Sequence, residues 1–390
     1  MLLIRNADLY DPQYLGLCDI LVAEERVTAV RPAGDINPAH LSGIDGGLRV
    51  VDAGGMMAMP GIIDRHVHFN GAGGEGGPAY RTPPLQLSSF IRAGVTSAVG
   101  MLGTDGTSRG LADLLMKARG LEAEGITTWM LTGSYAIPSA TLTGEVKRDL
   151  CLIDKVIGLK MAISDHRSSH PSLEEIRRSV SDVRVGGILS GKAGCLCVHM
   201  GSEPAAFDPL LEAVRGTGIP ITQFAPTHIA RSGTLVKEAI SFGRLGGYLD
   251  ITAAPGKNPD FGLSTSVVVS TLLDENVPLG NITLSSDGNG SMPTFDGRGE
   301  MTGMRIGPLD SVLRTVVEMF REKDLPREKT ISLVTSNVAD HLKLARKGRL
   351  RPGCDGDVLV LDGDFCLKFV AAKGKLLMEG GNVAVRGTFE

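Results

Sequence analysis

The sequence is poor in aromatic residues, in cysteine and in long apolar runs. Aromatic residues make up 4% of the 390, and the six cysteines lack the spacing of a zinc finger or a disulfide framework. Sparse, scattered cysteine is typical of a reducing compartment. No run approaches the roughly 20 apolar residues that a membrane span needs. Residues 1–10 also lack the pattern of a secretory signal. We therefore expect a soluble, cytoplasmic protein.

The charge is nearly balanced. A net charge of -4 without any basic run gives no reason to expect binding to nucleic acid or to a membrane surface. The hydrophobic content of 42% and the charged content of 22% are those of an ordinary globular protein. Glycine is abundant, with 51 residues, mostly where apolar runs end, which indicates many tight transitions from strand to loop.

The two ends of the chain differ in pattern from its middle. Short alternating stretches predict antiparallel strands in residues 1–55 and again in residues 345–390, and we expect these to form one small β-sandwich domain. Residues 56–344 alternate eight apolar strand candidates with segments of helical periodicity. That order predicts an α/β fold, a (β/α)₈ TIM-like barrel. Chemistry in this fold gathers where the strands end, so polar residues at those points are the candidates.

The segment MPGIIDRHVH, residues 59–68, ends in the strongest single signal. In a strand, His66 and His68 project from the same face, and two neutral imidazoles on one edge make half of a metal site. The ends of the predicted strands carry, in chain order, His66, His68, Lys160, His199, His228 and Asp287. A lone histidine on an apolar strand is more often structural. Four of the chain's 8 histidines at equivalent positions are hard to attribute to chance.

Lys160 is the unusual member of this set. A lysine amine among apolar residues is costly to bury unless it is paired or neutral. One interpretation is a structural ion pair. The other is that the neutral amine captures CO₂, and that the resulting carbamate bridges two divalent cations.

These motifs resemble those of the amidohydrolase superfamily, which has HxH on its first strand, lysine on the fourth, histidines on the fifth and sixth, and aspartate on the eighth. PGIIDRHVH and GRLRPGCDGDVLVLD are similar to that superfamily's entry and exit segments. HVHFNGAGGEGGP, LTGSYAIPS, ISDHRSS, PTHIAR and LSSDGNGS further resemble the isoaspartyl (beta-aspartyl) dipeptidases, over essentially the whole chain.

The resemblance implies a ligand set and a mechanism. His66 and His68 would bind one Zn²⁺ and His199 and His228 a second, although nitrogen and oxygen donors also suit other divalent ions. Carboxylated Lys160 would bridge the two ions. A hydroxide shared by them would be the nucleophile. Asp287, a ligand of the first ion, would act as general base and then general acid.

The loop NGAGGEGGP places Glu75 among glycines. It is either a solvated carboxylate on a mobile loop or the group that holds a substrate ammonium. Gly71, Gly73 and Gly76 also satisfy GxGxxG, but the following PAYRTPP offers no helix for a pyrophosphate, so a nucleotide-binding oxidoreductase is not favoured.

Two arginines follow predicted strands beside the metal candidates. Arg167 and Arg231 are either surface residues or guanidinium forks for two carboxylates. Tyr135, at the end of the third strand, is either a packing residue or a donor to a developing oxyanion. Thr104 and Ser291 are weaker polar candidates on loops.

An ammonium, two carboxylates and an amide between them describe a β-aspartyl dipeptide. In the resembling family Glu75 would bind the α-amino group, Tyr135 the scissile carbonyl, and Arg167, Arg231 and Ser291 the carboxylates. Gly73, Gly74 and Thr104 occupy further substrate-contacting positions. The family resemblance also implies a homo-oligomer, an octamer.

Two rival functions stay open. One is another amidohydrolase activity, on a cyclic amide (dihydroorotase or hydantoinase type) or an N-acyl amino acid. The other is a non-catalytic scaffold on the same barrel, which is disfavoured because such proteins lose metal ligands.

Other reactive side chains receive no committed role. Cys195 and Cys197 alternate with His199 and are expected to fill the barrel interior. Asp165 is a candidate for orienting a metal ligand. His341 does not lie at a strand end.

Overall fold

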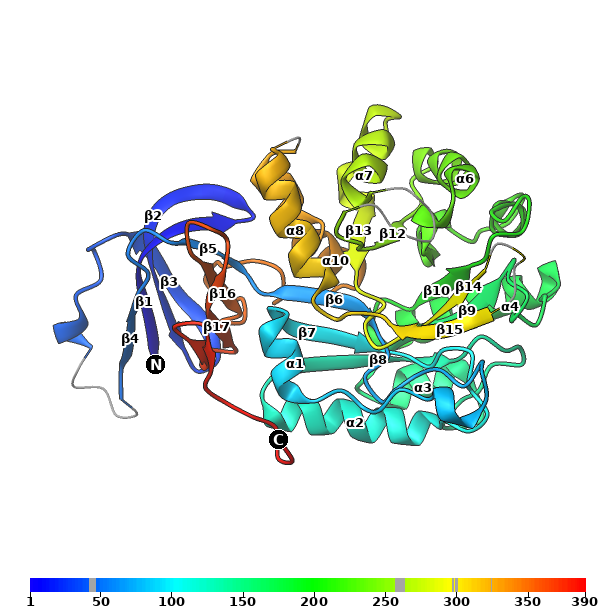
Figure 1. The fold of residues 1–390 in the computed structure, drawn as a ribbon, viewed down its shortest axis with the longest axis horizontal. Helices are drawn as coiled ribbons and strands as arrows, with labels where there is room; N and C mark the ends of the chain where they lie inside the picture. The colour runs from blue at the N-terminus through cyan, green and yellow to red at the C-terminus, as the bar shows by residue number, and fades with distance from the viewer. Residues whose placement is uncertain (42–46, 257–263, 297, 299–300, 324) are drawn as a thin grey trace.

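The computed structural model describes residues 1–390 except 42–46, 257–263, 297, 299–300 and 324. It is a mixed α/β fold in which a curled parallel sheet with helices around it adjoins a sheet made from both ends of the chain (Figure 1). Among the described residues, no helix is long and apolar enough to cross a membrane.

The curled sheet begins with six parallel strands that pair in chain order, from β6 to β11. These strands are β6 (Ile62–Val67), β7 (Val95–Gly100), β8 (Thr127–Gly133), β9 (Val156–Ile163), β10 (Cys195–Met200) and β11 (Phe224–Thr227). A parallel pair, β12 (Leu249–Thr252) and β13 (Ile282–Ser285), follows, and a single bridge between Val67 and Gly288 joins the end of β13 to β6. All eight predicted strands are therefore present as parallel strands.

Helices connect the parallel strands. They are α1 (Leu87–Arg92), α2 (Leu111–Glu124), α3 (Val146–Leu152), α4 (Leu173–Ser190), α5 (Asp208–Val214), α6 (Gly233–Arg244), α7 (Thr265–Asp274), α8 (Ser311–Glu322), α9 (Arg327–Ser332) and α10 (Ser336–His341). The start of α4 shows how local sequence sets an element: Ser172 and Glu175 form a reciprocal capping box, and Gly191 ends the helix with a left-handed φ of 69°.

The second sheet has nine strands from both ends of the chain. They are β1 (Leu2–Asp11), β2 (Gln13–Ala23), β3 (Arg26–Pro32), β4 (Arg49–Asp52), β5 (Met57–Pro60), β16 (Val358–Leu361), β17 (Leu367–Ala372), β18 (Lys375–Glu379) and β19 (Asn382–Val383). Their order is β19-β18-β17-β16-β5-β1-β2-β3, with β4 beside β1. The antiparallel pair of β5 and β16 unites the two ends, as the similar sequence texture of the ends indicates. A division of this sheet into two layers, as the sandwich requires, stays a prediction.

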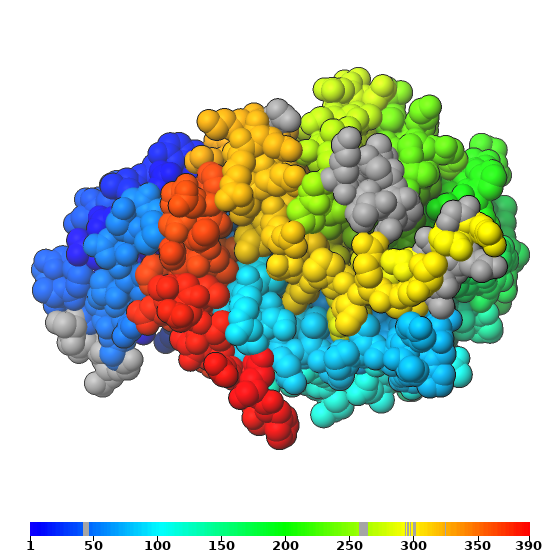
Figure 2. Space-filling view, viewed as in Figure 1, coloured from blue at the N-terminus to red at the C-terminus, as the bar shows by residue number. Residues whose placement is uncertain are grey.

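The largest apolar core joins the two sheets. It contains residues of strands β6 to β13 and their helices together with terminal-sheet residues such as Met59 and Leu359, whereas Ile4, Leu9, Ile20 and Val22 belong to a separate buried cluster of the terminal sheet. Figure 2 shows the red C-terminal segment packed against the cyan region that contains α1, where Ser88 N donates to the Glu390 carboxylate at 3.0 Å. One further hairpin, β14 (Ser291–Phe295) with β15 (Met301–Ile306), follows β13 and brings Ser291 to the ends of the parallel strands.

Candidate active site

Three of the predicted metal ligands meet where β6 and β13 end. His68 Nε2 lies 3.1 Å from Asp287 Oδ1, and His66 Nε2 lies 3.5 Å from the same oxygen. Both histidines are buried. These three side chains are a group able to hold one metal ion.

The hydrogen bonds of His68 show that this group fits a cation. Its Nδ1 lies 3.0 Å from the carbonyl oxygen of Met101 and must donate its proton there. Its Nε2 lies 3.1 Å from Asp287 Oδ1. A ring that carries a second proton would donate to this carboxylate, whereas a ring with a lone pair on Nε2 would share a metal ion with it, and both arrangements place a positive charge between the two side chains. Among the described residues, His66 Nδ1 has no hydrogen-bond partner. Burial holds the pKa of His66 well below 6.5, so its ring is neutral and can offer a lone pair to a metal ion.

Lys160 lies below the three ligands, inside the curled sheet. It is fully buried, and its Nζ lies 3.3 Å from His66 Nε2. Among the described residues no carboxylate makes an ion pair with it, which is unusual for a buried lysine. Burial lowers the pKa of Lys160, because the charged amine loses its hydration. The shift favours the neutral amine, which is the form that reacts with CO₂.

His199 and His228 complete the set from β10 and the end of β11. The ring of His228 lies 4.7 Å from that of His199 and 4.9 Å from that of His66, measured between ring centres. His228 and Asp287 both have a left-handed backbone, with φ of 64° and 51°. Such conformations are strained for residues other than glycine and often occur at functional sites. All six predicted ligands are thus brought together.

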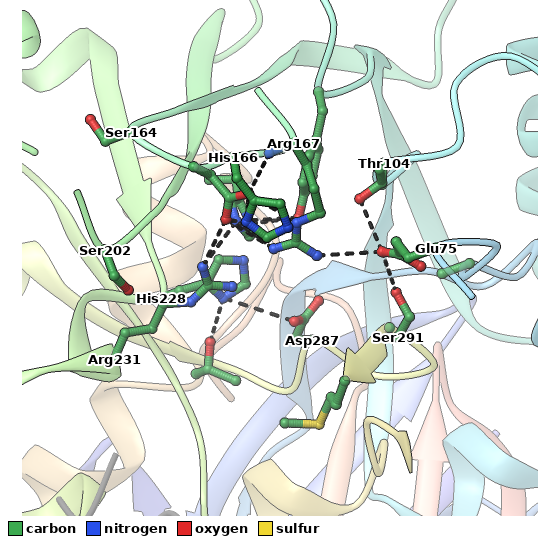
Figure 3. Close-up of a pocket in the computed structure, with 18 of the residues that line it drawn as sticks. Glu75, Thr104, Ser164, His166, Arg167, Ser202, His228, Arg231, Asp287 and Ser291 are labelled. Atoms are coloured by element: carbon green, nitrogen blue, oxygen red, sulfur yellow. Dashed lines mark hydrogen bonds and ion pairs between the residues drawn. The ribbon is translucent and has the colours of Figure 1, made fainter. Parts of the chain in front are cut away.

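A cavity of about 770 Å³ opens above this cluster. Of the predicted site residues, the cavity is lined by His68, Glu75, Thr104, Tyr135, Arg167, His199, His228, Arg231, Asp287 and Ser291. Figure 3 shows Glu75, Thr104 and Ser291 on one side of Asp287, and His228 and Arg231 on the other. The metal candidates therefore lie between Glu75 and Arg231 (Figure 3).

Glu75 is fixed at the wall of the cavity by one of its two oxygens. Oε1 accepts from Ser291 Oγ at 2.8 Å and from Thr104 Oγ1 at 3.0 Å, and it lies 3.4 Å from Arg167 Nη1. Oε2 is buried and has no hydrogen-bond partner in the described part of the chain. A buried carboxylate oxygen without a donor is costly, so this atom indicates a site for a ligand that carries N–H donors.

Gly73 and Gly74 shape the loop that carries Glu75 and are not among the residues lining the cavity. Gly73 has a φ of 88°, and a Cβ there would lie 2.1 Å from the carbonyl oxygen of Tyr80. Only glycine fits this close approach. Their expected contact with substrate stays a prediction.

Tyr135 faces His199 across the cavity floor. Its hydroxyl lies 2.5 Å from His199 Nδ1, and the side chain is buried. Burial raises the pKa of Tyr135 above its ordinary value, so the hydroxyl keeps its proton and can donate a hydrogen bond.

Asp165 has a more central place than the sequence indicated. It is 5% exposed and contacts Arg167, Arg231 and His199 together. The sequence signal was its position in SDHR directly after β9, which alone says nothing of partners on β10 and beyond β11. The Met101 carbonyl and the Thr252 hydroxyl, 2.6 Å from His228 Nδ1, also orient ligands and carry no sequence signal.

The two interior cysteines behave as small apolar groups. Burial raises the pKa of the Cys195 thiol to about 11, so it is not the thiolate that binds metals. Cys197 Sγ lies 3.9 Å from Lys160 Nζ, a weak contact below the ligands.

The chain was compared with known proteins. No protein-family model matches it. The D-hydantoinase of a Thermus species has the same fold, with a TM-score of 0.70 at 14% identity over 99% of this chain and 97% of that one. The mitochondrial allantoinase of Aquarana catesbeiana is 30% identical over 98 residues, which are 25% of this chain and 18% of that protein. This match therefore spans less than a fifth of the allantoinase's length. Fold and site define the chain as a member of the amidohydrolase superfamily.

One structural neighbour is far more similar. The beta-aspartyl dipeptidase of Fervidobacterium islandicum AW-1, solved in complex with beta-Asp-Leu, is 41% identical over 98% of both chains, with a TM-score of 0.89. The chain belongs to the beta-aspartyl dipeptidase family, whose members are hydrolases acting on peptide bonds.

Proposed function

We propose that this protein hydrolyses β-aspartyl dipeptides at a centre of two divalent metal ions, Zn²⁺ by preference. The observation that carries the proposal is the unpartnered, buried Oε2 of Glu75 in the cavity that also holds two arginines and the His/Asp cluster. A β-aspartyl dipeptide has a free α-ammonium group for Glu75 and two carboxylates for guanidinium groups. A cyclic amide such as dihydroorotate has no ammonium group.

The donor set of the cluster supports the metal centre. His66, His68 and Asp287 would hold one ion, and His199 and His228 the other. Lys160, as its carbamate, would lie between the two. When bound, two divalent ions make a hydroxide nucleophile available near neutral pH and polarise a carbonyl oxygen. The closeness of His66 and His68 to Asp287 and the burial of Lys160, which lowers its pKa, support this assignment.

The protein's own residues would act on the substrate as follows. Glu75 accepts hydrogen bonds from the α-ammonium and so places the aspartyl side-chain amide over the cluster. The Tyr135 hydroxyl donates to the carbonyl oxygen as negative charge develops there. Asp287 accepts the proton that the attacking water loses and delivers it to the leaving nitrogen. Arg231 and Arg167, with Ser291 and Thr104, fix the carboxylate end and the position of Glu75.

The finer features of the fold belong to the same proposal. We infer that the eight parallel strands close into a (β/α)₈ barrel within residues 56–344, and that residues 1–55 and 345–390 form the smaller β domain. Because β5 (Met57–Pro60) pairs with β1 and β16, the smaller domain would also include residues 57–60. The bridge between Val67 and Gly288 supports closure, because it brings the last strand beside the first.

Hydrolysis of three substrates tests the proposal: β-Asp-Leu, α-Asp-Leu and dihydroorotate, each with protein that is loaded with zinc in the presence of bicarbonate. We expect cleavage of β-Asp-Leu alone. Cleavage of dihydroorotate in its place would favour the cyclic-amide activity that the similarity to allantoinase also suits. No cleavage of β-Asp-Leu by protein with two bound metals would reject the dipeptidase assignment.

A further inference from the structure

Asp165 is the most highly bonded carboxylate of the cavity, and the proposed mechanism gives it no task. It lies in the loop after β9, preceded by Ser164 with a φ of 54°. Its Oδ1 accepts from Arg167 N and Nε, both at 2.9 Å. Its Oδ2 accepts from Arg167 Nη2 at 2.9 Å, Arg231 Nη1 at 3.2 Å and His199 Nε2 at 2.9 Å. One buried side chain thus joins three residues of the predicted site.

The contact with His199 determines which ring nitrogen faces the cluster. His199 Nε2 lies 2.9 Å from Asp165 Oδ2, 3.1 Å from Arg231 Nη1 and 3.4 Å from Arg167 Nη2. The carboxylate can only accept and is the nearest of the three, and both arginines already donate to it, so this contact favours the proton on Nε2 and the lone pair on Nδ1. The Tyr135 hydroxyl, 2.5 Å from Nδ1, donates to that lone pair, which agrees with the same tautomer. Histidine ligands are commonly oriented in this way by a carboxylate on the far nitrogen. Asp165 therefore directs Nδ1 of His199 toward the cavity.

The contacts with the arginines make the two guanidinium groups unequal. Arg167 donates to Asp165 through Nε and Nη2, the edge of the guanidinium that binds a carboxylate with two parallel hydrogen bonds. Its Nη1 lies near Glu75. The two-donor edge is therefore not free for a substrate carboxylate. Arg231 contacts Asp165 through Nη1 only. Within the described part of the chain, no acceptor bonds to Arg231 Nε or Nη2. Arg231 thus keeps a free fork, whereas Arg167 joins Asp165 to Glu75.

We propose that Asp165 is a positioning residue with two effects. It presents Nδ1 of His199 as the metal-binding nitrogen, and it holds Arg167 as a brace so that Arg231 is the guanidinium that takes a substrate carboxylate. The second effect rests on the proposed function. The first concerns this chain's own ligand geometry and does not depend on the substrate.

The substitution Asp165→Asn tests both effects, because it preserves size and removes the charge. The metal-free variant is titrated with Zn²⁺, and bound metal is measured by mass spectrometry after dialysis. We expect the weaker of the two sites to lose about 10- to 100-fold in affinity. For β-Asp-Leu we expect KM to rise at least tenfold, because both arginines lose their anchor. Unchanged zinc affinity overturns the first effect, and an unchanged KM overturns the second.

Glu203→Gln is the matched control. Glu203 lies at the rim of the same cavity, but its carboxylate contacts His170, at 3.0 Å, and no predicted ligand. Its zinc affinity and KM should equal those of the wild type. If Asp165→Asn does not fold, as judged by circular dichroism, Asp165→Glu replaces it. That variant keeps the charge and should lose less than tenfold in zinc affinity, whereas a loss as large as that from removing a zinc ligand overturns the proposal.

The zinc titration also separates this inference from the proposed function. A protein that binds two zinc ions and cleaves no β-Asp-Leu would reject the dipeptidase assignment, yet its zinc affinity would still respond to Asp165→Asn. A protein that cleaves β-Asp-Leu with zinc affinity and KM unaffected by Asp165→Asn would reject the inference alone.

Discussion

Two clusters of buried charge lie at opposite ends of the parallel strands, and they differ in how completely their polar atoms are satisfied. Near the start of β8, Lys347 Nζ donates to Asp357 at 2.6 Å, to Thr127 at 2.7 Å and to Asp355 at 2.9 Å. All three of its protons are used. At the other end, Glu75 Oε2 and His66 Nδ1 are buried and have no partner among the residues that the structure describes, and His68 Nε2 lies 3.1 Å from the Asp287 carboxylate.

The difference distinguishes a cluster that stabilises the fold from one that can bind a ligand. A fully paired charge cluster has no capacity left for a ligand and holds its elements together. The cluster at the strand ends is incomplete until a ligand supplies cations and N–H donors. An unsatisfied buried atom is costly, so the one that belongs to a cavity-lining residue beside the His/Asp cluster, Glu75 Oε2, indicates a binding site.

The largest expected effect follows from removing the buried lysine of the incomplete cluster. Lys160→Met fills the same space without an amine, so we expect loss of bound zinc and a fall in kcat/KM on the order of 10⁴-fold, equivalent to about 5.5 kcal/mol. Metal content and dipeptide hydrolysis measure this. Lys155→Met, at the opposite end of the same strand, is the control and should retain metal and activity. Full zinc content in Lys160→Met would contradict the bridging role.

A change in the cluster formed by Lys347, Asp355 and Asp357 should lower the free energy of unfolding and leave catalysis unchanged. Lys347→Met leaves two carboxylates without their cation, and we expect the free energy of unfolding to fall by about 3–5 kcal/mol. Denaturant unfolding measures this. Arg119→Met removes an exposed pair with Asp154, 3.4 Å long, and should change stability by less than about 1 kcal/mol. A normal unfolding curve for Lys347→Met would show that the buried cluster is dispensable.

Tyr135→Phe removes one hydroxyl from the incomplete cluster. If that hydroxyl stabilises a developing oxyanion, kcat should fall by roughly 10²- to 10³-fold with little change in KM. Steady-state kinetics on β-Asp-Leu separates the two constants. A rise in KM at constant kcat would instead assign Tyr135 to ground-state binding.

The smallest expected effect on activity comes from Glu75→Gln. The amide keeps an acceptor for Thr104 and Ser291 but replaces the unpartnered oxygen with a donor that repels an ammonium group. We expect kcat/KM to fall by about 1.5–3 kcal/mol, roughly 10- to 150-fold. Stability should stay equal or increase, because an unsatisfied buried charge disappears. Glu203→Gln is again the matched control. A loss of stability without loss of activity would assign Glu75 to the structure.

Much of this protein was determined by local sequence pattern. Eight apolar runs that alternate with helical periodicity predicted the parallel strands, and the common edge at which parallel strands end explains why His66, Lys160 and Asp287 meet although they are far apart in the chain. The similar alternation of residues 1–55 and 345–390 predicted one β domain from both ends. The strand that pairs with both β1 and β16, β5 (Met57–Pro60), lies just beyond the first of these segments.

Only the tertiary structure decided how the polar atoms are paired. Side-chain hydrogen bonds depend on the relative positions of separate strands and loops, which no local pattern encodes. The Met101 carbonyl sets the tautomer of His68, and Asp165 binds partners from β10 and from beyond β11. Arg167 and Arg231 differ in how many of their nitrogens contact Asp165, and this too depends on tertiary structure. In the sequence, both are arginines that follow a predicted strand. The sequence names the reactive groups, and the three-dimensional pairing decides which of their atoms remain free to act.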